Sequence, residues 1–278
     1  MKPVNLLRHP GMVLGAGLVA GFVAASLLAS WLSPFDPQAI PTGLAAASLR
    51  PPGPTHALGT DVLGRDLLSR VLYGGRVSLL VGVGVELLVV LLGTAIGVLA
   101  GYYGGWLDSL LMRVTDVVMA FPSLVLAIGL IAVFETPGLD KVFLVLVLLG
   151  WTTIARVVRG QVLSLREREY IQAARAVGVR DRVILARHLL PNCLGTILVA
   201  ATLGVGGNMV AEAGLSFLGL GAQAPTISWG AMLAEGQTFL ASAPWVAVFP
   251  GLALMLAVLG VNLLGDGLRD LLDPRFRQ

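Results

Sequence analysis

The sequence predicts an all-α membrane protein with six transmembrane helices. Of its 278 residues, 56% are hydrophobic and only 13% are charged, and the mean hydropathy is +0.86. This composition lies outside the range of soluble globular proteins. In addition, six stretches are apolar and nearly free of charge, and a helix needs about 20 such residues to cross the bilayer.

The predicted spans follow one another along the chain. The first comes after Lys2 and Arg8 and is too long for the core of a cleaved signal peptide, so we expect a retained anchor. The fourth is short, but it can cross if Lys141 and Arg156 extend toward the interfaces and the helix continues into its flanks. The full set is 11–33, Val77–Gly101, Val117–Phe134, Val142–Ala155, about 193–211 and a segment within Gly236–Gly265.

The distribution of lysine and arginine predicts the orientation, because cytosolic segments are enriched in both. Six spans place both termini on one side. With that side in the cytosol, the inward residues outnumber the outward ones by 14 to 5. The inward set is Lys2, Arg8, Arg113, Arg156, Arg159, Arg166, Arg168, Arg175, Arg180, Arg182, Arg187, Arg269, Arg275 and Arg277; the outward set is Arg50, Arg65, Arg70, Arg76 and Lys141.

The segment 34–76 between the first two spans is predicted to carry an interfacial helix on the extracytoplasmic surface. It begins rich in proline and continues as LGTDVLGRDLLSRVLYGGR. Thr60 can cap a short helix here, and an apolar stripe would rest on the membrane. The expected i,i+4 pairs are Asp61 with Arg65 and Asp66 with Arg70, and the stripe is Leu63, Leu67 and Val71.

No enzyme signature is present in the sequence. The histidines His9, His56 and His188 are scattered and form no HExxH motif, and Cys193 is the single cysteine. A phosphate-binding loop ending in Gly-Lys-Ser/Thr is also absent, since the only lysines are Lys2 and Lys141. If the protein uses ATP, another chain must bind it.

Two carboxylates fall inside the predicted spans, where an ionisable group is costly and often functional. Glu86 lies in the second span, and Glu212 lies at the outer end of the fifth, after Asn208. These three residues belong either to a translocation path or to structural hydrogen bonds between helices. Both interpretations stay open from the sequence.

Glycines spaced by four residues predict close helix packing. Gly93, Gly97 and Gly101 form one such series in the second span, and Gly17 and Gly21 form another in the first. We expect these smooth faces to pack within the subunit or against a partner.

Residues 166–192, REREYIQAARAVGVRDRVILARHLLPN, concentrate charge in an otherwise apolar chain. The periodicity predicts two short amphipathic helices, which are typical of an element that docks into a groove of another protein. A charged loop that only sets topology would lack this periodicity, and a helix lying on lipid would prefer bulkier residues than alanine. The first helix presents Tyr170, Ala173, Ala174 and Val177 and ends at Gly178; the second presents Val179, Val183, Ala186 and Leu190 and is broken by Pro191 before the fifth span.

The order Ala173-Ala174, three residues, Gly178, and then Leu190-Pro191 resembles the EAA loop of the inner-membrane permease subunits of bacterial ABC importers. In that family the loop, here about 160–191, forms a coupling helix seated in a cleft of the ATPase subunit. This chain has Gln172 where Glu is usual and His188 where Ile is usual. The resemblance implies ATPase-coupling roles for Tyr170, Gln172, Ala173, Ala174, Ala176, Val177, Gly178 and Pro191.

Four further stretches, 58–82, 107–124, 212–233 and 262–275, resemble the second permease subunit of the dipeptide, oligopeptide and nickel group. The resemblance implies the type I permease fold of ABC importers, with a cytosolic coupling helix, in the bacterial inner membrane. It also implies a homologous second permease, two ATPase subunits that bind ATP and magnesium, and an extracytoplasmic binding protein. Neither a cofactor in this chain nor nucleic acid is expected.

Peptides are the favoured substrate. Some nickel-type members carry histidines in the fifth span, where this chain has Asn208, Met209 and Val210. Nickel or another small solute is the alternative within the family, and a stand-alone ion-coupled secondary transporter using Glu86 and Glu212 is the alternative outside it. We expect an anchor and extracytoplasmic segment over 1–75 and a permease core with five transmembrane helices over 76–278.

Overall fold

The computed structural model describes residues 10–41 and 48–272. Lys2, Arg8, Arg275 and Arg277, which enter the charge comparison, and His9 lie outside these residues. Within them the regular elements are helices, and one isolated bridge joins Thr60 and Asp66. In chain order the elements are α1 (Pro10–Leu27), α2 (Ala29–Leu32), α4 (Leu67–Tyr103), α5 (Gly105–Met119), α6 (Ser123–Ile131), α7 (Leu139–Arg166), α8 (Glu169–Ala176), α9 (Asp181–Val183), the π-helix η2 (Ile184–Leu189), α10 (Leu190–Phe217), α11 (Trp229–Gly236), the 3-10 helix η3 (Gln237–Phe239) and α12 (Trp245–Leu272).

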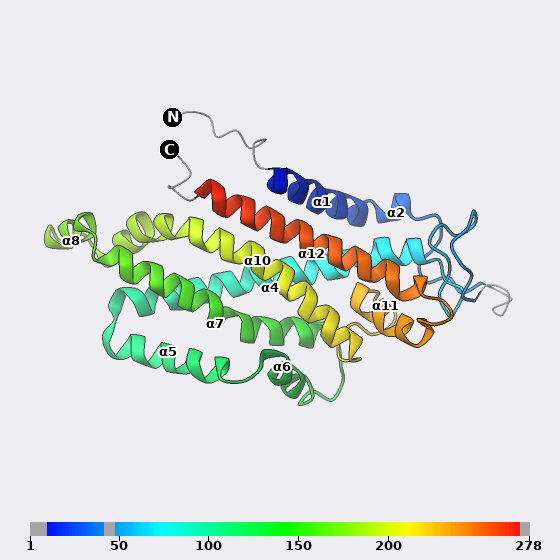
Figure 1. Cartoon of the computed structure of the whole chain (residues 1–278). Coiled ribbons are helices and arrows are strands. Elements are labelled where there is room, and N and C mark those ends of the chain that lie inside the picture. Colours follow the sequence, from blue (N-terminus) through cyan, green and yellow to red (C-terminus); the bar gives the residue numbers. More distant parts are fainter. Residues whose placement is uncertain (1–9, 42–47, 273–278) are drawn as a thin grey trace.

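The long helices run back and forth between two ends of an elongated bundle (Figure 1). One end, here the α8 end, carries α8, and α1 begins and α12 ends on the side facing it; the other, the α11 end, carries α11 and the segment between α2 and α4. In the described residues, α1, α4, α7, the run Asp181–Phe217 and Trp245–Leu271 are long and apolar enough to cross a membrane. The bent α5–α6 pair adds a sixth crossing if it is taken as one span. With five or six such segments in the described residues, the prediction of a multi-pass all-α membrane protein is confirmed.

The third span is broken rather than continuous. The sequence predicts one apolar helix core over Val117–Phe134, but α5 ends at Met119, α6 begins at Ser123, and the two axes are bent by 86°. Pro122 precedes the first residue of α6. Proline has no N–H to donate, and it disfavours helical geometry in the residue before it, so α5 cannot continue through this point.

The separate interfacial helix predicted between Thr60 and Arg76 is wrong. Residues 60–66 form turns, and α4 begins at Leu67 and runs without a break for 37 residues. Asp66 does not pair with Arg70; its carboxylate accepts from the backbone N–H of Ser69 at 2.8 Å and so caps α4. The local helix signals around Leu67 and Val71 therefore belong to the first turns of a transmembrane helix.

The Asp61/Arg65 pair is confirmed as an ion pair at 2.6 Å, although it lies in a turn and not on a helix. Asp61 also receives a hydrogen bond from Arg70 at 2.8 Å, and Arg70 reaches Glu235 of α11 at 2.9 Å. Nothing in the sequence spacing points to Glu235, which is 170 positions from Arg65 and bonds to it as well. This charged cluster fastens the segment before α4 to α11.

Pro191 does not break the helix before the fifth span. The chain passes from α9 through η2 into α10 as one helical run, with Pro191 in the first turn of α10. In η2 the hydrogen-bond register widens, and the N–H of Leu190 donates to the carbonyl of Leu185. This π-helical turn carries the chain up to a residue that has no N–H. The change of register also buries Ile184 and Leu189, while Ala186 of the predicted stripe is exposed.

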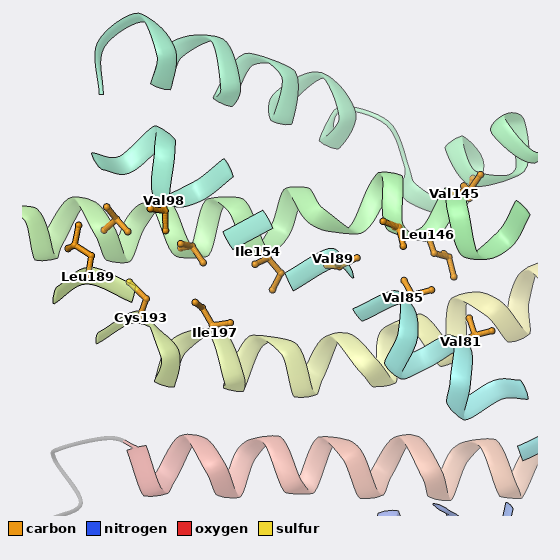
Figure 2. Packing of buried hydrophobic residues seen from close by; sticks show 14 of the residues in the cluster. Val81, Val85, Val89, Val98, Val145, Leu146, Ile154, Leu189, Cys193 and Ile197 are labelled. Atoms are coloured by element: carbon orange, nitrogen blue, oxygen red, sulfur yellow. The ribbon is translucent and has the colours of Figure 1, made fainter. Parts of the chain in front are cut away.

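The core lies where α4 runs between α7 and α10 (Figure 2). Val81, Val85 and Val89 recur every four residues and form one buried face of α4. Because lipid is as apolar as these side chains, close van der Waals packing holds the helices together. The facing side chains of α7, η2 and α10 that Figure 2 labels are Val145, Leu146, Ile154, Leu189, Cys193 and Ile197.

The glycine series of α4 is the closest contact surface between α4 and α7. A Cβ at Gly93 would lie 2.6 Å from Cβ of Ile154, and one at Gly97 would lie 2.5 Å from the carbonyl oxygen of Ala155. The predicted packing role of this series is thus confirmed within the subunit. Gly17 and Gly21 of α1 have open space beside them in this chain.

We expect Gly97→Ala to lower the unfolding temperature of the purified protein in detergent, because the added methyl group must push α7 away from α4. The cost of such overpacking is about 1–3 kcal/mol. Gly21→Ala is the matched control, since the added methyl group meets open space in a helix of similar composition. Equal unfolding temperatures for the two variants would contradict the α4–α7 contact.

Candidate functional site

The predicted docking element projects from the α8 end of the bundle (Figure 1). Helix α8 spans Glu169–Ala176, as the periodicity predicts. Glu169 lies in its first turn and Arg175 in its last, which is the arrangement that the helix dipole favours. Gln172 turns back along the chain and donates from Nε2 to the carbonyl of Glu167 at 3.2 Å. All of these contacts are local, so the helix itself follows from the sequence.

Gly178 ends α8, as predicted. Its φ is +77°, a region that side chains with a Cβ rarely adopt. Its N–H donates to the carbonyl of Arg175, and the N–H of Val179 donates to that of Ala174, both at 3.0 Å. These two bonds form a Schellman motif, which satisfies the last carbonyls of the helix and reverses the chain. Glycine is required here because of its backbone geometry.

One face of α8 packs against the subunit and the opposite face is exposed. Ile171 is fully buried, and the half-buried Ala174 packs beside it against the main core. The opposite side is open: Tyr170 is 45% exposed and Val177 is 79% exposed. The predicted face therefore splits, because Ala174 points toward the subunit. The buried pair Ile171 and Ala174 was detectable from its i,i+3 spacing.

The exposed surface of α8 is small in side-chain bulk and partly apolar. Val177 and Tyr170 place apolar side chains on this exposed surface, where a partner can contact them. We call this set the α8 outer surface: Tyr170, Gln172, Ala173, Ala176 and Val177, all exposed. Gly178 and Pro191 are also exposed, the latter in the first turn of α10.

Arginines at this end tie α7 to its neighbours. Arg159 forms a two-point ion pair with Asp108 of α5, with nitrogen to oxygen distances of 2.5 and 2.7 Å. Arg166 donates from Nη1 to the carbonyl of Gly101 on α4 at 2.9 Å. The arginines therefore hold tertiary structure in addition to any effect on topology.

The structure brings Glu86 and Asn208 together inside the bundle. Asn208 of α10 donates from Nδ2 to Oε2 of Glu86 on α4 at 2.8 Å. Glu86 is 4% exposed, and its other carboxyl oxygen has no hydrogen-bond partner. The carboxyl group also lies against Gly204, where a side chain would leave no room for it. The pair thus links α4 to α10.

Glu86 and Asn208 line a cavity of about 1000 Å³ between α4, α7, α10 and the broken α5–α6 span. Val118, Met119, Phe121 and Ser123, which lie around the break, form one wall. The opposite wall of α10 contains Gly204, Gly207 and Gly214, so its surface has few side chains. The lining is mainly apolar, with a single carboxylate, which suits a site that contacts a solute without holding it tightly.

Glu212 lies apart from this cavity and is fully buried. It accepts hydrogen bonds from the hydroxyl groups of Ser78 at 3.2 Å and Ser216 at 2.7 Å. The Ser78 hydroxyl in turn accepts from the backbone N–H of Trp229, at the start of α11. Glu212 therefore joins α4, α10 and α11 through hydrogen bonds. This arrangement agrees with the interpretation of Glu212 as a structural residue and not as part of a translocation path.

Comparison with known proteins agrees with the fold and with the resemblance. The family described as "Binding-protein-dependent transport system inner membrane component" matches residues 93–278. A chain of the MetNI methionine ABC transporter, in an inward facing conformation, has a similar fold, with a TM-score of 0.59 and 20% identity over 70% of this chain and 93% of that one. The predicted permease fold of ABC importers is thus confirmed.

Several curated relatives are much more similar in sequence. A dipeptide transport system permease protein, DppC, from Alkalihalophilus pseudofirmus is 46% identical over 82% of this chain and 75% of the relative. A putative peptide transport system permease protein from Brucella abortus is 44% identical over 98% and 90%. A glutathione transport system permease protein, GsiD, from Pectobacterium atrosepticum is 46% identical over 81% and 75%. The chain therefore belongs to the family of binding-protein-dependent transport system inner membrane components, the permease subunits of ABC importers.

Proposed function

We propose that this chain is one of two permease subunits in an ATP-driven importer of dipeptides and oligopeptides. The names of the relatives, which concern dipeptides, peptides and glutathione, support small peptides as the substrate class. The partners in this proposal are a homologous second permease, two ATPase subunits that bind ATP and magnesium, and an extracytoplasmic binding protein. This chain itself needs no cofactor.

The observation that carries the proposal is the exposed α8 outer surface on a helix that is packed against the core of the subunit. Ile171 anchors α8 to the core, while Val177 on the other side has no cover in this chain. Such a helix fits a cleft in an ATPase subunit, and it can pass a displacement on because it is not a flexible tether. The residues proposed to contact or shape this joint are Tyr170, Gln172, Ala173, Ala174, Ala176, Val177, Gly178 and Pro191.

This role of α8 places the α8 end in the cytosol. The described start of α1 and end of α12 both point toward this end, so both termini are cytosolic in the proposal (Figure 1). The α11 end then faces the binding protein. Arg50, Arg65, Arg70 and Arg76 lie in or beside the segment that joins α2 to α4, at this extracytoplasmic end. The charge distribution of the described residues supports this orientation.

The cavity beside Glu86 and Asn208 is the part of this chain that we assign to the translocation path. Its volume of about 1000 Å³ is ample for a short peptide. Peptides share a backbone but differ in side chains, so an apolar wall with few polar groups lets many of them pass. Glu212 has a structural role in this proposal, because its oxygens are engaged by buried hydroxyl groups.

Co-purification and uptake test the proposal together. A tagged chain, isolated from its native membranes, is expected to bring down ATPase chains and a second permease. Proteoliposomes of that complex, loaded with ATP and supplied with the binding protein, should accumulate labelled dipeptides or tripeptides. Uptake of nickel in place of peptide would assign the alternative substrate. Uptake driven by an ion gradient without ATP would identify a secondary transporter instead.

Replacement of Gly178 by valine is expected to uncouple ATP hydrolysis from uptake or to release the ATPase subunits. A side chain at a φ of +77° costs about 1–2 kcal/mol, so the Schellman turn opens and α8 loses its position. Peptide uptake and bound ATPase are measured in the same preparation. Gly160→Val is the control, because Gly160 lies within α7 and a Cβ there meets open space. Normal substrate-stimulated transport by Gly178→Val would refute the coupling assignment.

Glu86→Gln is expected to keep the complex assembled and to lower peptide uptake less than about tenfold, since the amide can still accept from Asn208. The companion variant Glu212→Ala leaves Ser78 and Ser216 without their acceptor, at a cost of about 1–3 kcal/mol, and should reduce the yield of folded protein. Size-exclusion profiles and uptake rates distinguish the two effects. Complete loss of uptake by an intact Glu86→Gln complex would show that the path depends on the charge.

A further inference from the structure

Tyr102 lies in the last turn of α4, and its side chain contacts both sides of the Gly178 turn. Its hydroxyl group donates to Oδ1 of Asp181, the first residue of α9, at 2.6 Å. Its ring lies under the guanidinium group of Arg175, the penultimate residue of α8, with Cζ 4.5 Å from the ring centroid. One side chain thus connects α4 to the residues that enter and leave the turn.

Both contacts involve a charged group, and the tyrosine is 5% exposed. A short hydrogen bond from a phenol to a carboxylate is among the stronger kinds, and an arginine over an aromatic face adds an electrostatic attraction. Arg175 and Asp181 carry opposite charges and contact the same side chain from two elements, Arg175 at the ring and Asp181 at the hydroxyl group. The exposed turn is therefore held against α4 through specific polar contacts, in addition to the apolar packing of Ile171.

The residue before Tyr102 receives a further attachment. Arg166, the last residue of α7, donates to the carbonyl of Gly101 at 2.9 Å. The two ends of the segment 166–181 are consequently fastened to consecutive residues of α4. A displacement of α8 must either move the end of α4 or break these contacts.

Helix α4 extends from this joint to the opposite end of the bundle (Figure 1). There Asp66 caps its first turn, and Arg70 bonds to Asp61 and Glu235 in the cluster that holds α11. Because α4 is one continuous helix of 37 residues, we expect a displacement of Tyr102 along the helix axis to displace Arg70 as well. The chain itself joins α8 to α7 and, through the Gly178 turn, to the run Asp181–Phe217. Helix α4 has no such covalent link to α8, so its movement with α8 depends on side-chain contacts such as those of Tyr102.

We propose that Tyr102 is a positioning residue that transmits the displacement of α8 into α4, and so connects the ATPase cleft to the α11 end. The inference rests on the proposed function, because it needs α8 to be moved by a docked ATPase. Tyr102 touches neither the substrate cavity nor the α8 outer surface. It acts through Arg175 and Asp181 by holding the turn and α4 as one body.

The test uses the complete transporter in proteoliposomes, with ATP hydrolysis and labelled peptide uptake measured in the same vesicles. Tyr102→Phe keeps the ring under Arg175 and removes only the bond to Asp181. ATP hydrolysis is expected to stay near the wild-type rate, while peptide imported per ATP falls by roughly tenfold or more, as expected for loss of one hydrogen bond to a charged group. Tyr103→Phe is the control, because that neighbour is 51% exposed.

Two aspartate variants keep the test decisive if the phenylalanine variant folds poorly. Asp181→Asn retains an acceptor for the tyrosine hydroxyl and should recover much of the transport per ATP that Asp181→Ala loses. The double variant Tyr102→Phe with Asp181→Ala should be no worse than either single variant, since both remove the same bond. An unchanged ratio of uptake to hydrolysis in Tyr102→Phe and Asp181→Ala overturns the inference alone.

A merely structural role for Tyr102 has a different signature. In that case uptake and hydrolysis fall together, in proportion to the amount of assembled complex, and the ratio between them stays at the wild-type value. That result also overturns the inference. If the wild-type complex retains no ATPase or imports no peptide with ATP, the proposed function fails first, and the inference fails with it.

Discussion

The close approach of α4 and α7 is the contact on which the rest of the molecule depends. Gly93, Gly97 and Gly101 bring the two backbones so near that a single methyl group at any of them would meet α7. In lipid the hydrophobic effect contributes little between helices, and such contacts have to come from shape. Because α7 packs along α4, the last residue of α7, Arg166, lies beside the end of α4 and bonds to Gly101.

The two ends of α4 differ in chemistry, and this difference follows from what each end must hold. At the α11 end, a cluster of carboxylates and arginines attaches α4 to the turn at Asp61 and to Glu235 of α11. At the α8 end, a tyrosine and an arginine hold a short surface helix. From Val77 to Gly101 the residues of α4 are apolar or small except for Glu86, so the middle of the helix is free to border a cavity.

The cavity exists because one span is interrupted. Pro122 separates α5 from α6, and the irregular backbone at the break lines the cavity wall. Non-helical backbone at membrane depth is tolerated where it borders a cavity or is buried in protein. Sequence periodicity predicts the apolar character of this span but not its bend, because the alternative positions of α6 depend on packing against α7.

Much of the fold and of the docking element could be predicted from sequence because the signals are local. The spans follow from runs of apolar residues, and α8 follows from the helical periodicity of its apolar residues. The end of α8 follows from Gly178, which adopts a positive φ. The start of α4 and the continuation of the helix through Pro191 could not be predicted. Several residues in each region could cap or end a helix, and the surrounding structure decides which of them does so. Sequence by itself determined which stretches are apolar enough to enter the membrane and that the chain turns at Gly178. Only the tertiary structure decided that Glu86 meets Asn208, that Arg70 meets Glu235 and that Tyr102 meets Asp181, because each contact joins residues far apart in the chain whose distance is set by helix packing.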